Sequence, residues 1–121
     1  MNPESGATLV VLPADLIFAA RIRAAAEQEG VEVSLARTVR QAGEMVGGDT
    51  RSLIVDLDTR SGDPVGLIER VKQSQPQVRV LAYVSHVRED TIAAAREAGA
   101  DQVIARGAFA KRLPELLLEY S

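Results

Sequence analysis

The strongest constraint on the fold is the regular alternation of short apolar runs with segments of helical periodicity. Five apolar runs each precede a helical pattern, and connections of a few residues join them. Strands and helices that alternate in this way form a parallel sheet covered by helices on both faces, with right-handed crossovers. The central runs fit, because strands of a parallel sheet are buried on both sides. The predicted strands are residues 7–12, 31–36, 52–56, 79–84 and 102–105.

Several predicted helices have recognisable capping residues. Asp15 can cap a helix that runs to about residue 29, and Gly30 ends it. We expect the buried face of this helix to carry Leu16, Ala19, Ile22 and Ala26. Two further helices begin after Thr38 and Asp63, and two more cover about residues 88–98 and 111–120.

Composition excludes several classes of function. A chain of 121 residues, 46% hydrophobic and 26% charged, is predicted to be one globular domain, residues 7–121, after a disordered tail, residues 1–6. The net charge of −3 argues against direct contact with nucleic acid or a membrane. The absence of cysteine excludes disulfides and thiolate metal sites, and a single histidine, His86, argues against a histidine-based metal site. We expect a cytoplasmic protein.

Asp56 is the first candidate for chemistry. It ends the apolar run of residues 53–55 and opens a loop that contains Gly62. The carboxyl end of a buried strand is where open α/β sheets place their ligands. A lone carboxylate there could accept a phosphoryl group or hold a metal, but both roles require further acids and a cation.

Three local patterns resemble the receiver domain of two-component response regulators. They are LIVD at residues 53–56, followed by a Gly-Asp loop, AGAD at residues 98–101 before the fifth strand, and GVEV at residues 30–33. The resemblance covers nearly the whole chain. It implies a flavodoxin-like (CheY-like) doubly wound sheet of five parallel strands, in the order 2-1-3-4-5, with helices on both faces.

The resemblance also assigns site positions, and several depart from the family pattern. Asp56 falls on the phospho-accepting aspartate of the family. Leu12 and Pro13 fall on its metal-binding acidic pair, so we expect Mg²⁺ binding to be lost and no cofactor to be required. Arg106 replaces the lysine after the fifth strand, and Val103 replaces the aromatic switch residue.

The hydroxyl position of the family has two possible matches. It falls on Val84 when counted back from the fifth strand, or on Ser85 if the intervening loop is one residue shorter. Ser85 could donate a hydrogen bond to a phosphoryl group, whereas Val84 could not. The remaining polar residues have simpler interpretations: Asp58 as a solvated turn residue, Asp63 as a helix cap and His86 as a residue of the loop at the rim.

These positions predict an atypical receiver, or pseudo-receiver, that acts through protein contacts in bacterial signalling and is not an enzyme. At rest, Asp56 and Arg106 would form a hydrogen-bonded pair without chemistry. Two alternatives stay open. One is a working receiver that takes phosphate onto Asp56. The other is a small-molecule sensor with a crevice lined by Leu12, Asp56, Val84 and Arg106.

The last helix indicates a contact surface. It carries more apolar side chains than one buried stripe requires, namely Leu113, Leu116, Leu117, Leu118 and Tyr120. We expect the side formed by the fourth helix, fifth strand and last helix to bind a protein partner or a second copy of the chain.

Overall fold

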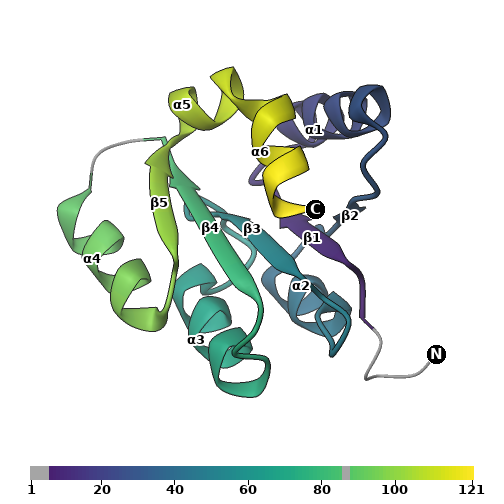
Figure 1. Cartoon of the computed structure of the whole chain (residues 1–121). Coiled ribbons are helices and arrows are strands. Elements are labelled where there is room, and N and C mark those ends of the chain that lie inside the picture. Colours follow the sequence, from purple (N-terminus) through teal and green to yellow (C-terminus); the bar gives the residue numbers. More distant parts are fainter. Residues whose placement is uncertain (1–5, 86–87) are drawn as a thin grey trace.

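The sheet has the predicted order, β2-β1-β3-β4-β5, and all its strand pairs are parallel. The computed structural model describes residues 6–85 and 88–121. Helices cover both faces of the sheet (Figure 1). His86 and, except for Gly6, the predicted tail at residues 1–6 lie outside the described residues.

Strand and helix bounds follow the sequence pattern closely at the centre of the sheet. The strands are β1 (Leu9–Leu12), β2 (Ser34–Leu35), β3 (Ser52–Asp56), β4 (Arg79–Val84) and β5 (Gln102–Ala105). The helices are α1 (Leu16–Glu29), α2 (Val39–Met45), α3 (Pro64–Ser74), α4 (Glu89–Ala98), α5 (Arg106–Lys111) and α6 (Leu113–Tyr120). The predicted second strand is wrong in length, because only two of its six residues pair with β1.

Side-chain alternation along the strands divides the core into two clusters. Val80, Ala82 and Val84 of β4 pack on the face covered by α2, α3 and α4. Leu81 and Tyr83 pack on the opposite face, under α1, α5 and α6. Successive side chains of a strand point to opposite faces, so the register determines which side chains meet at the end of the sheet.

The predicted helix caps form. The Asp15 carboxylate accepts from the Phe18 N–H at 2.7 Å and starts α1. Asp63 accepts from the Gly66 N–H at 3.0 Å and starts α3. Gly99 ends α4 with φ at +117°, a conformation that side-chain-bearing residues rarely adopt.

The buried face of α1 agrees with the prediction at Ile22 and Ala26 and differs at its start, where Phe18 is buried and Leu16 is not. Its buried residues are Phe18, Ile22 and Ala26, whereas Leu16 is 75% exposed. Residues on a helix are about 100° apart, so Leu16 lies roughly 200° around the axis from Phe18. The helix therefore turns Phe18, and not Leu16, toward the core, and its three buried residues recur every four positions.

Candidate functional site

Asp56 lies where β3 ends, and its carboxylate is engaged by backbone on both sides. The side chain is fully buried. One oxygen accepts from the Asp58 N–H at 2.9 Å, and the other accepts from the Ala14 N–H at 3.3 Å. Burial raises the pKa of Asp56 above its usual value, and the Asp58 N–H opposes that rise. Asp56 therefore ties the loop between β1 and α1 to the loop that follows β3.

An aromatic cluster lies on the sheet beside Asp56. Tyr83 is the direct partner of Asp56 in the register between β3 and β4. Its ring stacks on Phe109, with centroids 4.1 Å apart, and contacts Phe18 at 5.7 Å. Burial raises the pKa of Tyr83, and the nearby Asp56 charge raises it further. The Tyr83 hydroxyl is buried and has no hydrogen-bond partner within residues 6–85 and 88–121.

The predicted pair between Asp56 and Arg106 is wrong, because Arg106 bonds Asp15 instead. Its guanidinium donates to the second Asp15 oxygen at 2.7 Å and lies 4.5 Å from the centroid of the Phe18 ring. The Phe18 N–H and Arg106 lower the pKa of Asp15, and the bond to Asp15 raises the pKa of Arg106. Arg106 reaches Asp15 while remaining partly in water, which costs it less solvation than a bond to the buried Asp56.

The positions of the expected acidic pair hold no carboxylate. Leu12 is fully buried and packs in the core, and Pro13 is buried next to it. Two other acids near this end of the sheet have partners of their own: Asp15 binds the Phe18 N–H and Arg106, and Asp58 binds Ser85 and Arg88. Among the described residues, no group of three or more His, Cys, Asp or Glu side chains is arranged to hold a metal ion. Of the four residues expected to line a crevice here, Leu12, Asp56 and Val84 are each exposed by 3% or less, and the Arg106 side chain is 31% exposed.

Asp58 connects the site to the loop between β4 and α4. One of its oxygens accepts from both the Ser85 N–H, at 2.7 Å, and the Ser85 hydroxyl, at 2.6 Å. Its other oxygen pairs with the Arg88 guanidinium. Only 20% of the Asp58 side chain is exposed. The interpretation of Asp58 as a solvated turn residue is therefore wrong.

The two candidate hydroxyl positions have different surroundings. Val84 is buried within β4, where it pairs with Ala105. Ser85 lies beyond the strand and is exposed, and its hydroxyl donates to Asp58. Asp56 and Asp58 thus link three loops: those after β1, β3 and β4. Val103, at the expected aromatic position, is partly buried against the cluster under α2, α3 and α4.

The apolar residues of the last helix do not form the predicted contact surface. Leu113, Leu116, Leu117 and Tyr120 are all exposed by 3% or less, and they pack in the core with residues of α1 and the sheet. They follow the spacing i, i+3, i+4, i+7, which is one buried stripe. Leu118 alone is left over, with 50% of its surface exposed.

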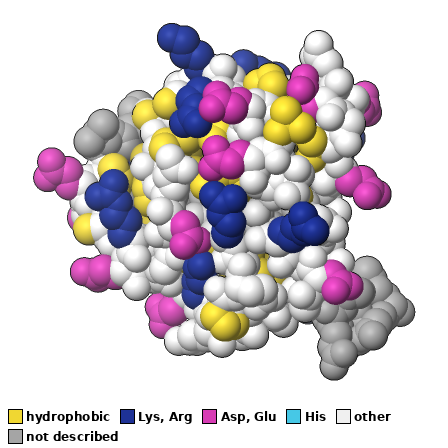
Figure 2. All heavy atoms as spheres, viewed as in Figure 1, with side chains coloured by type: hydrophobic (Ala, Val, Ile, Leu, Met, Phe, Trp, Pro, Cys, Tyr) yellow, Lys and Arg dark blue, Asp and Glu magenta, His cyan; other side chains and the backbone are white. Residues whose placement is uncertain are grey.

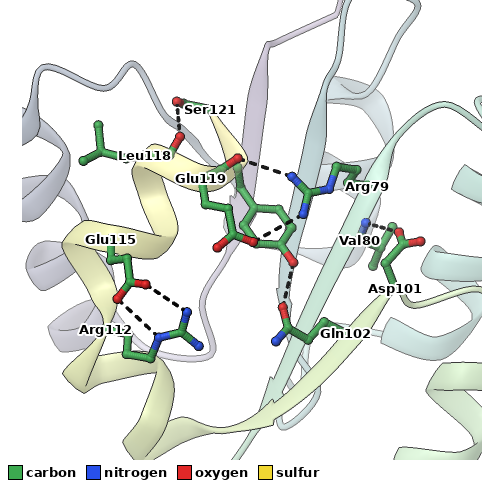
Figure 3. Close-up of polar contacts among 10 residues, drawn as sticks. Arg79, Val80, Asp101, Gln102, Arg112, Glu115, Leu118, Glu119 and Ser121 are labelled. Carbon is green, nitrogen blue, oxygen red and sulfur yellow. Dashed lines mark hydrogen bonds and ion pairs between the residues drawn. The ribbon is translucent and has the colours of Figure 1, made fainter.

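Charged side chains are scattered over the surface of α6 and the neighbouring strands (Figure 2). Figure 2 shows basic and acidic side chains interspersed there, with hydrophobic side chains only in small separate areas. Figure 3 shows two ion pairs at this surface, Arg79 with Glu119 at 3.3 Å and Arg112 with Glu115 at 3.2 Å. Below them, the Tyr120 hydroxyl donates to Gln102 at 2.9 Å. This face is therefore polar and largely paired.

Comparison with known proteins identifies the fold. No protein-family model and no curated protein matches the sequence. Among solved structures, a response regulator from Thermotoga maritima is 22% identical, with a TM-score of 0.76 over 95% of this chain and 97% of that one. A response regulator receiver domain from Clostridium thermocellum is 17% identical, with a TM-score of 0.80 over 94% and 93%. The beryllofluoride-activated NtrC4 receiver domain dimer is 23% identical, with a TM-score of 0.75 over 94% and 98%.

These neighbours show that the chain has the CheY-like fold of response regulator receiver domains. The predicted fold is confirmed in its class and in its strand order. None of the helices in the described residues is long and apolar enough to cross a membrane.

Proposed function

We propose that this chain is an atypical receiver domain that works as a protein interaction module in bacterial signalling, without Mg²⁺-dependent phosphorylation. In this proposal the chain is not an enzyme, and it acts in the cytoplasm. The observation that carries the proposal is the state of Asp56: both of its oxygens accept backbone N–H groups, and Leu12 and Pro13 lie where the resemblance expects metal-binding acids.

The chemistry of phosphoryl transfer supports this reading. Transfer depends on positioning and on neutralising charge on the phosphoryl group, and Mg²⁺ supplies much of that neutralisation. Mg²⁺ requires several hard oxygen ligands in nearly octahedral geometry. Leu12 offers a hydrocarbon side chain and Pro13 offers none with oxygen.

The contacts of Asp58 extend the proposal from chemistry to signalling. A receiver that reports phosphorylation needs a hydroxyl that can turn toward the phosphoryl group. Ser85 is the only hydroxyl at the two candidate positions, and Asp58 accepts both its N–H and its O–H. We infer that Asp58 holds Ser85 and Arg88 in position and that no phosphate is needed to place them.

The partner in this proposal is another protein or a second copy of the chain. The NtrC4 receiver domain is a dimer in its beryllofluoride-activated form, so this fold can present a protein interface. The net charge of −3 argues against a nucleic-acid or anionic-membrane partner.

The proposal is tested by titrating Mg²⁺ while following amide NMR signals of Ala14, Asp56 and Asp58. We expect no saturable shifts in the low millimolar range. Pro13→Asp is the matched gain-of-function variant, because it adds one carboxylate directly after β1, at a position of the expected acidic pair, and it should bind Mg²⁺ more tightly than the natural chain. Saturable shifts around Asp56 in the natural chain would favour the alternative, a receiver that accepts phosphate on Asp56.

A further inference from the structure

The first turn of α1 exposes two large apolar side chains. Leu16 is 75% exposed and Ile17 is 80% exposed. Within the described residues, the only other large hydrophobic side chain that is exposed is Leu118 on α6, at 50%. Adjacent exposed Leu and Ile residues at the start of a helix form a patch that a partner could cover.

A hollow of about 380 Å³ lies beside this patch, between α1 and the end of β2. Small apolar side chains and two arginines both contribute to its lining. Its lining includes Leu16, Ala19, Arg23, Leu35, Ala36 and Arg37, together with the acidic Asp15. The hollow is on the β2 side of α1, away from the α4, β5 and α6 surface considered above.

The rim of the hollow has uncompensated positive charge. Arg23 and Arg37 are both exposed, and neither forms an ion pair within residues 6–85 and 88–121. The acid that borders the hollow is Asp15, and its two oxygens are taken by the Phe18 N–H and Arg106. The two arginines therefore face solvent in a chain whose net charge is −3.

We propose that this hollow is the docking surface for an acidic amphipathic helix of a partner protein. Apolar side chains of the helix would enter the hollow and cover Leu16, while its carboxylates would pair with Arg23 and Arg37. A strand is a poorer occupant, because β2 offers an edge of only two residues for backbone pairing. This inference rests on the proposed function as an interaction module and names the surface and partner chemistry that it uses.

The probe is a synthetic helical peptide of about 14 residues, with leucines at i, i+3, i+4 and i+7 and glutamates on either side of them. A second peptide carries lysine in place of every glutamate. Each is titrated into the natural chain while amide NMR signals are followed. The glutamate peptide should give saturable shifts at Leu16, Ala20, Arg23 and residues 35–37, with an affinity at least about tenfold above that of the lysine peptide.

Three variants at exposed positions test the apolar contact of Leu16 and the charge of the two arginines. Leu16→Gln should weaken the glutamate peptide by about tenfold or more, and Arg23→Glu with Arg37→Glu should reverse the preference between the peptides. Leu118→Gln, the matched control on α6, should leave both affinities unchanged.

Equal affinity for the two peptides, or no saturation by the glutamate peptide at millimolar concentration, would overturn the docking proposal. Shifts confined to another face would also overturn it while leaving an interaction module intact. Failure of the proposed function would show instead in the Mg²⁺ titration, which does not involve this surface.

Discussion

The contacts of Asp58 predict a measurable cost when its carboxylate is removed. Asp58→Ala deletes the acceptor of two hydrogen bonds from Ser85 and one ion pair with Arg88. Ser85 is exposed, so water can replace part of what is lost, and each bond to the carboxylate is worth about 1 kcal/mol. The Arg88 side chain is 48% exposed, so its pair adds roughly 0.5 kcal/mol. The free energy of unfolding should fall by about 2–3 kcal/mol.

Urea denaturation of the single and double variants measures this cost. Ser85→Ala removes only the hydroxyl, and the coupling energy between Asp58→Ala and Ser85→Ala should be about 1 kcal/mol. Glu44→Ala is the control, since it removes an ion pair with Arg40 in which the side chains are 67% and 90% exposed, and it should cost less than about 0.5 kcal/mol. Amide hydrogen exchange at Ser85 should accelerate in Asp58→Ala alone. A coupling energy within error of zero would show that Asp58 does not hold Ser85 in place.

Two further predictions concern burial. The pKa of Asp56 in the folded chain is raised above 3.8, so the stability that protonated Asp56 contributes is full below 3.8 and is lost as pH rises through the folded pKa. The free energy of unfolding of Asp56→Asn, measured relative to the natural chain, should therefore increase over that pH range. A difference that stays constant with pH would refute this prediction. Leu116→Ala, at a fully buried position, should cost about 2–5 kcal/mol by urea denaturation. Leu118→Ala, on the exposed side of the same helix, should cost under about 1 kcal/mol. Equal costs for the two variants would contradict the finding that the apolar stripe of α6 packs in the core and not on the surface.

The central part of the fold could be predicted from sequence because its signals are local. The bounds of β3, β4 and β5 follow from short apolar runs between turn residues, and the caps at Asp15 and Asp63 need only the next three residues. The second strand was overestimated because alternation alone does not show how many residues find a partner at a sheet edge.

The site was harder to predict because its contacts join residues far apart in the chain. Arg106 and Asp15 are 91 positions apart, and the sequence offered Asp56 as an equally reasonable acid. Tyr83 was missed because its place beside Asp56 depends on the register between β3 and β4, which hydrophobic pattern does not set. One signal was available for α6, since its apolar residues have the spacing of a single buried stripe.

The most direct test of the account is whether Asp56 accepts a phosphoryl group. The chain is incubated with acetyl phosphate and Mg²⁺, and separately with beryllofluoride and Mg²⁺, then followed by intact-mass spectrometry and amide NMR. With Leu12 and Pro13 in place of metal-binding acids, and with both Asp56 oxygens accepting N–H groups, the account predicts no added phosphoryl mass and an unchanged spectrum. An adduct that disappears in Asp56→Asn, with shifts spreading from Ser85 into α4, would contradict it and establish a working receiver.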